Sequence, residues 1–298
     1  MKKFFIAFII SIVISIVIFP IRGIDRGIPL CSIVGYIFYF LFTVIYLKKT
    51  EGVISKKIIL LSILSGIGVV QLPLRIIDFQ RTLLTFPDFL MHVSGIVSGY
   101  IAYNKKYNIK WSVFFAGLAI CIFMFFKGYT MWIDYLNYDT FTGKIDDNRE
   151  YNLKIQTNTG DTLSLYDFRG KYLLFDCWNS FCGICYKKMP EVQKLYDIYK
   201  GNTNVVIGSM HSYMKNTEKL FNDKEKNEDY TTGSEILKGR NYTFPCWAIA
   251  KNDPVLKEIG VDSYPTVLIF NKQGKLIFRG SIENAKNQIE KLLKGDGK

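Results

Sequence analysis

The stretch DCWNSFCGICYKKMPEV, from Asp176 to Val192, contains three of the six cysteines of the chain, two of them in a CxxC pattern. It overlaps YLLFDCW (172–178), an apolar run typical of a buried strand, and apolar residues then recur at helical spacing to about Tyr199. Cys182 is therefore predicted at the start of a helix. Unpaired backbone N–H groups there stabilise a thiolate, which is the attacking species in disulfide exchange.

Two other uses of the pair Cys182 and Cys185 have to be weighed. A structural zinc ion needs about four ligands, and the C-terminal half offers only Cys177, Cys246 and His211 besides the pair. A disulfide across two residues closes almost no loop and so constrains the unfolded chain little. The favoured interpretation is a redox-active disulfide, Cys182–Cys185, with no metal and no bound cofactor.

The C-terminal half, 150–298, has the pattern of an α/β domain with a mixed central sheet. Strands are predicted at YNLKIQ (151–156), YLLFDCW and NVVIGSM (204–210), and a hairpin at PTVLIF–NKQG–KLIFRG (265–280). An amphipathic helix closes the domain at about 282–293. The segment 215–259 is mixed and is predicted to be helical in parts.

The N-terminal region, 1–128, is rich in Ile, Val, Leu and Phe and is predicted to be an all-α membrane domain. Its five apolar runs, 4–20, 28–47, 58–74, 84–103 and 111–128, are the predicted transmembrane helices. The run 84–103 is the weakest, because it carries Pro87 and Asp88 at its outer end. Residues 129–149 would then form an extracytoplasmic linker.

The net charge of +12 is distributed in a way that predicts membrane topology rather than binding of nucleic acid. With five spans and a cytoplasmic N-terminus, lysines concentrate in the inner segments: Lys2, Lys3, Lys48, Lys49, Lys56, Lys57, Lys105, Lys106 and Lys110. The chain is thus expected in the lipid bilayer of the cell (inner) membrane, with its C-terminal domain in the periplasmic or extracytoplasmic space.

The segment LYDFRGKYLLFDCWNSFCGICYKKMPEVQKLY (165–196) resembles the core of the TlpA/ResA family of membrane-anchored, thioredoxin-like thiol–disulfide oxidoreductases. A second landmark of that family, a cis-proline before a strand, is matched by VDSYPTVLIF (261–270). The resemblance covers the C-terminal half only and does not extend to the membrane region.

This resemblance implies roles for individual residues. Cys182 would be the nucleophile, Cys185 the resolving thiol, Asp176 a buried proton acceptor and Pro265 a cis-proline beside the disulfide. The residues implied in substrate binding are Trp178, Phe181, Gly183, Ile184, Tyr264 and Thr266.

The function implied is a protein-disulfide oxidoreductase that reduces client disulfides through a mixed disulfide, on a route such as cytochrome c maturation. An upstream membrane thiol donor would re-reduce the pair. A thiol oxidase or isomerase with the same residues, and a redox-inactive membrane sensor or scaffold, are the alternatives. A peroxiredoxin-type peroxidase would need a PxxxTxxC setting, which Cys182 lacks.

The other four cysteines are expected to be packing residues. Cys177 and Cys246 could alternatively pair, or Cys246 could be a further redox thiol. Cys31 and Cys121 lie in predicted spans two and five, where an electron relay is the alternative to packing.

Overall fold

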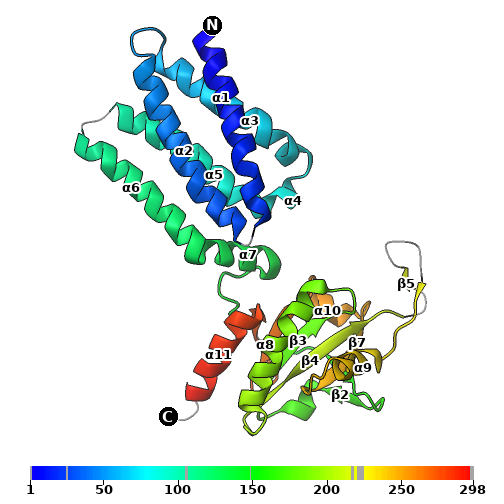
Figure 1. The fold of residues 1–298 in the computed structure, drawn as a ribbon. Coiled ribbons are helices and arrows are strands. Elements are labelled where there is room, and N and C mark those ends of the chain that lie inside the picture. The colour runs from blue at the N-terminus through cyan, green and yellow to red at the C-terminus, as the bar shows by residue number, and fades with distance from the viewer. Residues whose placement is uncertain are drawn as a thin grey trace. The chain divides into compact units, whose positions relative to one another are not determined.

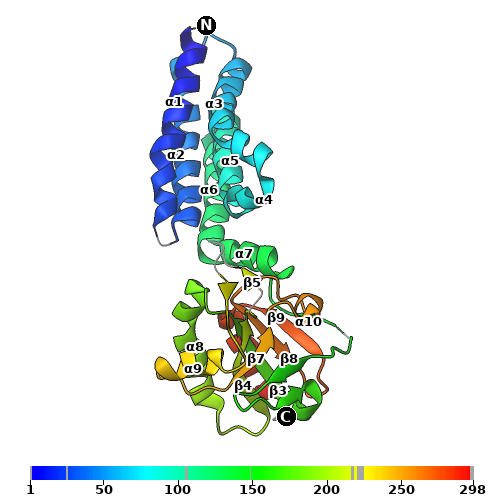
Figure 2. The same ribbon diagram turned by 90° about the vertical axis from the view of Figure 1, so that its right-hand side faces the viewer.

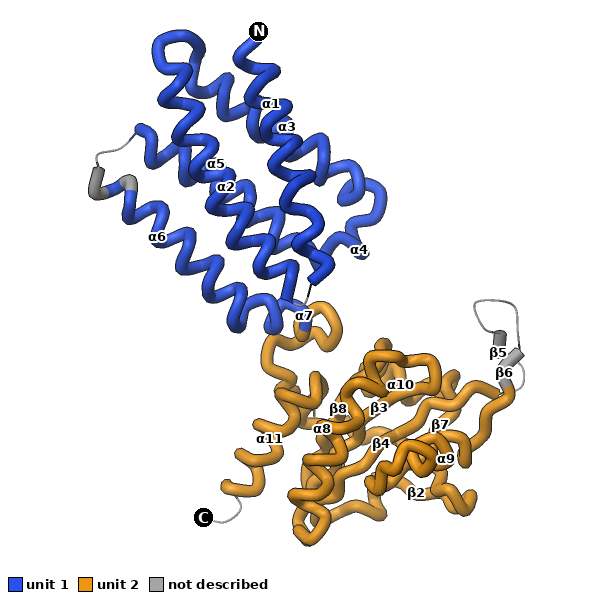
Figure 3. The backbone as a smooth tube through the Cα atoms, in the orientation of Figure 1, with its two compact units in different colours: residues 1–133 blue, residues 134–298 orange. Residues whose placement is uncertain are grey.

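The computed structural model describes residues 2–24, 26–104, 107–147, 149–215, 218–219 and 225–295. The chain forms two compact units, residues 1–133 and residues 134–298, shown in different colours in Figure 3. Lys105 and Lys106, which entered the charge argument, lie outside the described residues.

The first unit is a helical bundle (Figure 1). Its longer helices are α1 (Lys2–Ile18), α2 (Gly27–Lys49), α3 (Lys56–Ile77), α5 (Phe86–Tyr103) and α6 (Tyr107–Phe123). Shorter elements complete it: 3₁₀ turns at Phe19–Gly23 and Leu83–Thr85, α4 (Phe79–Thr82) and a π-helical turn at Met124–Gly128. Helix α7 (Tyr129–Tyr138) continues across the boundary between the units.

Four helical stretches among the described residues are long and apolar enough to cross a membrane: Lys2–Gly23, Gly27–Lys49, Lys56–Ile77 and Trp111–Tyr138. They coincide with four of the five predicted spans. The weak span at 84–103 coincides with α5, which has 18 residues and does not belong to these four. The number of five spans and their orientation stay predictions.

The bundle has apolar side chains outside and polar contacts inside. Large apolar residues such as Ile76 and Ile77 are about four-fifths exposed, at 80% and 81%. Inside, the Tyr39 hydroxyl lies 2.7 Å from the Ser15 hydroxyl and donates to the Ser11 carbonyl at 2.9 Å. An apolar exterior around small and hydrogen-bonded polar residues is the packing expected of helices in lipid.

The second unit is built on a seven-stranded mixed sheet of order β2-β1-β7-β4-β3-β8-β9. Figure 2 labels β3, β4, β7, β8 and β9 of this sheet. The strands are β1 (Lys154–Gln156), β2 (Thr162–Ser164), β3 (Tyr172–Trp178), β4 (Val205–Tyr213), β7 (Cys246–Ala250), β8 (Thr266–Phe270) and β9 (Leu276–Gly280). β3, β4 and β7 run parallel, and β8 pairs antiparallel with β3 and with β9. The mixed sheet, strand β3 and the hairpin are therefore confirmed.

Helices cover both faces of this sheet. α8 (Gly183–Tyr199), α9 (Thr232–Gly239) and α11 (Ile282–Gly295) contribute to the apolar core on one face, and α10 (Pro254–Glu258) to the core on the other. A short 3₁₀ turn, Leu165–Phe168, precedes β3, and β5 (Glu218–Lys219) and β6 (Glu225–Lys226) form a separate pair. The two cores hold β3 between them, so every residue of this strand is buried.

The predicted linker is in part a piece of the second unit. The Asp134 carboxylate accepts a hydrogen bond from the Asn284 side chain at 2.7 Å, and the Tyr138 carbonyl accepts one from Arg279 at 2.9 Å. Lys144 forms an isolated bridge with Phe278 of β9. The compact unit therefore begins at residue 134 and not at residue 150, because these contacts attach the segment to β9 and α11.

A substitution at Gly143 tests whether the segment that begins at residue 134 is part of the folded second unit. Its φ of +79° is in the left-handed region, and a Cβ placed on it would collide with the Phe278 ring. We expect Gly143→Ala to destabilise a fragment covering residues 134–298 by more than about 1 kcal/mol. Gly201→Ala is the matched control, since a Cβ there meets no atom within 4 Å. Equal urea midpoints for the two variants would show that the segment is not part of the folded unit.

Candidate active site

Strand β3 carries the chain to the candidate site. It lies in the middle of the sheet between β4 and β8. Leu174 and Trp178 belong to the core that includes Cys185, whereas Phe175 and Cys177 belong to the opposite core. Side chains alternate along a strand, so Asp176 is on the same face as α8 and Cys185.

Cys182 caps the helix that follows. Its backbone is extended (φ −85°, ψ 90°), helix α8 begins at the next residue, and its sulfur accepts a hydrogen bond from the Cys185 backbone N–H at 3.1 Å. Cys182 is partly exposed and Cys185 is fully buried, and the two form a disulfide. Only Cys182 can therefore be reached by another protein, and the backbone N–H of Cys185, which can stabilise a thiolate, lies against its sulfur.

Asp176 is buried beneath the site with a relative exposure of 1%, and neither of its carboxylate oxygens has a hydrogen-bond partner among the described residues. Burial, followed by the nearby charge of Glu283, raises the pKa of Asp176 to about 7. A carboxyl group with this pKa can bind and release a proton near neutral pH, as a general base requires.

The loop between β3 and α8 is held by two side chains. His211 of β4 lies with Nε2 2.9 Å from the Ser180 hydroxyl, and the Tyr186 hydroxyl donates to the Ser180 carbonyl at 3.0 Å. Burial lowers the pKa of His211 to about 4, so the ring is neutral at physiological pH. These contacts fix the residues that immediately precede Cys182.

The proline turn lies at the same end of β3. Thr266 pairs with Cys177, so the antiparallel register places Pro265 level with the end of β3, from which the chain leads to Cys182. The peptide bond between Tyr264 and Pro265 is cis, as predicted. The Pro265 carbonyl accepts a hydrogen bond from the Tyr138 hydroxyl at 3.0 Å.

The residues predicted to bind substrate divide into two groups. Phe181 and Ile184, at 50% and 61% exposure, are accessible together with Gly183, and Tyr264 is partly exposed. Trp178 and Thr266 are buried, at 0% and 1%. The Trp178 ring, which was predicted to bind substrate, packs inside the core against His211 and Tyr186.

The Thr266 side chain is also directed inward. Its hydroxyl donates to the Ser263 carbonyl at 2.7 Å. The Thr266 side chain is therefore held within the turn and is not exposed at the surface.

The four remaining cysteines are free thiols. Cys177 is fully buried in the core opposite α8, and burial raises its pKa well above the usual value. Cys246 lies at the start of β7, and burial raises its pKa to about 11. Thiols that stay protonated are poor nucleophiles, so packing fits both better than a second redox centre does.

Sequence reasoning missed three residues around the site. Tyr138 was assigned to a linker, and Ser180 and His211 were given no role at the site. The spacing of Ser180, two residues before Cys182, places it near the helix start, but only the pairing of β3 with β4 brings His211 to it. Tyr138 has no signal in the sequence, because its contact spans 127 residues.

Comparisons with known proteins show sequence similarity to thiol–disulfide oxidoreductases and thioredoxin-like proteins. The AhpC/TSA family model matches residues 148–279. The chain is 29% identical over 168 residues to the thiol-disulfide oxidoreductase ResA of Bacillus thuringiensis subsp. konkukian, covering 56% of this chain and 86% of that protein. It is 27% identical over 158 residues to the thioredoxin-like protein YneN of Bacillus subtilis, covering 53% and 84%.

Two solved structures are also similar. The pneumococcal lipoprotein thioredoxin Etrx1 of Streptococcus pneumoniae is 22% identical, with a TM-score of 0.37 over 47% of this chain and 98% of that chain. A thiol-disulfide oxidoreductase of Bacteroides fragilis is 18% identical, with a TM-score of 0.39 over 48% and 99%.

The fold and the site define the C-terminal half as a thioredoxin-like domain with a disulfide at the start of a helix. The sequence comparisons confirm the predicted resemblance: this half is a thioredoxin-like domain and is similar in sequence to the ResA thiol–disulfide oxidoreductases.

Asp176 yields a prediction about stability. The folded carboxyl has a pKa of about 7 against an ordinary value of 3.8. As the pH rises from 4 to 7 the unfolded chain ionises first, so the folded state loses stability, by up to about 4 kcal/mol above pH 7. Asp176→Asn should therefore stabilise the second unit at pH 8 and have little effect at pH 4.

Denaturant unfolding at the two pH values measures this difference. The matched control is Asp262→Asn, which removes a carboxyl group from an exposed position. A stabilisation by Asp176→Asn that is the same at pH 4 and pH 8 would contradict a raised pKa.

Proposed function

We propose that this protein is a membrane-anchored thiol–disulfide oxidoreductase that reduces the disulfides of client proteins through Cys182 and Cys185. The observation that supports it most is the partly exposed Cys182 at the start of α8, whose sulfur is bonded to that of the fully buried Cys185. The asymmetry gives the two sulfurs different tasks, since one can be attacked from outside and the other cannot.

The reaction has two exchanges. The Cys182 thiolate attacks a client disulfide, forms a mixed disulfide and expels one client thiolate. Cys185 then attacks the Cys182 sulfur, which re-forms the Cys182–Cys185 disulfide and releases the second client thiolate. Two electrons pass from the protein pair to the client, so a donor must reduce the pair before the next cycle.

Asp176 would assist the second exchange. Cys185 is a buried thiol before it attacks, and it has to lose its proton in a place without water contact. A carboxyl group on the same face of the sheet with a pKa of about 7 is suited to accept that proton.

A client would bind at the exposed surface around Cys182. Phe181 and Ile184 provide apolar contact area, and Gly183 between them adds no side chain beside Cys182. The backbone at Tyr264 would pair with an extended client segment in the manner of an added strand.

Anchoring and orientation complete the proposal. The four long apolar helices support insertion of the first unit in the cell (inner) membrane. The asymmetry of lysines supports a cytoplasmic N-terminus and an extracytoplasmic second unit. Apocytochrome c and other exported thiol proteins are the clients that we propose there, with a membrane thiol carrier as the electron donor.

The reduction potential of the Cys182–Cys185 pair tests the direction of electron flow. For the full-length protein in detergent, we expect about −250 mV or lower, close to thioredoxin. A reductase needs such a value because the reduced pair has to give up its electrons. Equilibration with glutathione or dithiothreitol buffers, followed by alkylation of free thiols, measures it.

Cys182→Ser is the control that identifies the titrating pair. A midpoint near about −120 mV, which is that of a strong thiol oxidant, would overturn the reductase proposal and favour an oxidase of exported thiols. A titration that persists in Cys182→Ser would assign the redox activity to other cysteines.

A further inference from the structure

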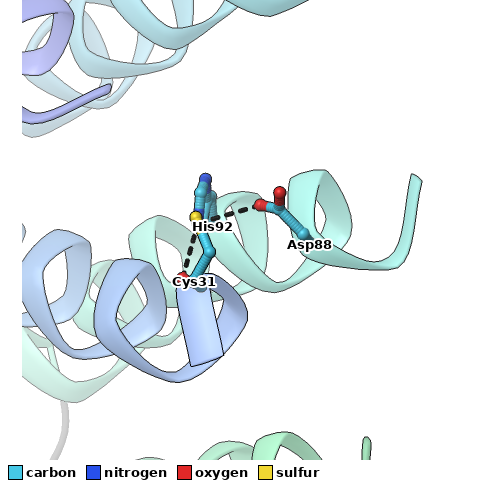
Figure 4. A group of neighbouring side chains, drawn as sticks. All are labelled: Cys31, Asp88 and His92. Carbon is cyan, nitrogen blue, oxygen red and sulfur yellow. Dashed lines mark hydrogen bonds and ion pairs between the residues drawn. The ribbon is translucent and has the colours of Figure 1, made fainter. Parts of the chain in front are cut away.

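Three side chains that bind metals in many proteins converge inside the first unit (Figure 4). Cys31 comes from α2, and Asp88 and His92 come from successive turns of α5. All three are at most 1% exposed. Ionisable residues in an apolar bundle are costly to bury and usually mark a functional site.

The three ligand atoms are spaced as a metal centre requires. His92 Nε2 lies 3.1 Å from Asp88 Oδ1 and 3.9 Å from Cys31 Sγ, and all three atoms lie within 4.8 Å of one another. A tetrahedral zinc ion, with bonds of about 2.0 Å to nitrogen and oxygen and about 2.3 Å to sulfur, places its ligand atoms roughly 3.3–3.6 Å apart. Small side-chain movements would therefore suffice.

The orientation of the His92 ring leaves one nitrogen for such an ion. Nδ1 lies 3.2 Å from the Gln71 side-chain amide, whose Oε1 is buried without a hydrogen-bond partner among the described residues. When the Gln71 side-chain amide is turned so that its oxygen and nitrogen change places, the His92 Nδ1–H can donate a hydrogen bond to Gln71 Oε1. The Nε2 lone pair then faces the Cys31 carbonyl (3.0 Å), Asp88 Oδ1 (3.1 Å) and the Cys31 sulfur (3.9 Å).

Arg22 and Arg75 form hydrogen bonds around the three side chains, outside the predicted ligand atoms. Arg22 binds Asp88 Oδ2 through Nε at 2.7 Å and Nη2 at 2.5 Å, which orients the carboxylate and leaves Oδ1 free of a donor from Arg22. Arg75 donates to the Gln71 carbonyl and to Thr85, and its Nε has no partner among the described residues. Hydrogen bonds from such residues to ligands are typical of metal sites.

A small cavity beside the cluster provides space for a fourth ligand. It has a volume of about 40 Å³, and Cys31, His92, Gln71, Arg22 and Arg75 contribute to its lining. A space of roughly 10–15 Å³ is enough for one water molecule. Three protein ligands and one open position are the arrangement found in catalytic zinc centres.

We propose that Cys31, Asp88 and His92 bind one divalent transition-metal ion of the zinc type, with a solvent-derived fourth ligand in this cavity. Thiolate and imidazole ligands select such ions over magnesium and calcium. Binding releases two protons, one from the Cys31 thiol and one from water that becomes hydroxide. The two new negative charges balance the two positive charges of the ion. The net charge of the buried cluster, including the arginines and Asp88, therefore does not change on binding.

This site is separate from the proposed disulfide chemistry, and it differs from the sequence-based expectation that the protein holds no metal. Cobalt(II) is the probe, because a cobalt–thiolate bond gives a charge-transfer band in the near ultraviolet and tetrahedral cobalt gives intense visible bands. The experiment uses full-length, metal-stripped protein in detergent with the Cys182–Cys185 disulfide oxidised, so that this pair cannot bind the ion.

We expect saturation at one cobalt per chain in the wild-type protein and in Cys121→Ser, which removes the other buried thiol of the first unit. Cys31→Ser should lose the charge-transfer band, and His92→Asn should weaken binding at least tenfold. No thiolate band in the wild-type protein, or a band that persists in Cys31→Ser, would overturn the proposal.

A second measurement does not depend on the folding of variants. In the wild-type protein, stoichiometric zinc should slow the alkylation of Cys31 by a membrane-permeant maleimide at least tenfold and leave Cys121 unaffected. Quantitative peptide mass spectrometry measures both sites in one sample. Equal rates at Cys31 with and without zinc would contradict metal ligation by this thiol.

Discussion

The hydrogen bond from the Cys185 backbone N–H, in the first turn of α8, to the Cys182 sulfur is the interaction on which the site depends. The sulfur caps the helix, so the same hydrogen bonding that begins α8 also stabilises negative charge on the attacking atom. It is placed there by β3, a strand that is buried on both faces and cannot shift without exposing two cores. The start of α8 and the buried strand β3 therefore act together to position the reactive sulfur.

Around this unit, the sheet determines what each neighbour can do. The alternation along β3 directs Asp176 to the side of Cys185 and Cys177 to the opposite core. The antiparallel pairing with β8 brings the proline turn to the end of β3. The parallel pairing with β4 brings His211 to the loop that leads to Cys182. The pairing register of β3 with its neighbours therefore determines which side chains surround the disulfide.

The sequence predicted those strands and turns whose pattern of apolar and polar residues lies within the segment itself. YLLFDCW was recognised as a strand because it is a continuous apolar run, and the hairpin at 265–280 because a polar turn separates two apolar runs. Strand β7 was missed, since CWAIA is only five residues long and lies in a mixed segment. The burial of Trp178 and the contact of Tyr138 with Pro265 depend on residues distant in sequence. The Cys31–Asp88–His92 cluster likewise needs α2 and α5 to pack together, so no spacing rule reveals it.

The account assigns the attack on the client to Cys182 and the release of the client to Cys185. Trapping the mixed disulfide tests this assignment most directly. The full-length protein carrying Cys185→Ser should accumulate a covalent, reductant-sensitive complex with a disulfide-containing client, with Cys182 as the linked residue in peptide mapping. Cys182→Ser should accumulate none. A complex that forms through Cys185 in the Cys182→Ser protein, or no complex with either variant, would contradict the account.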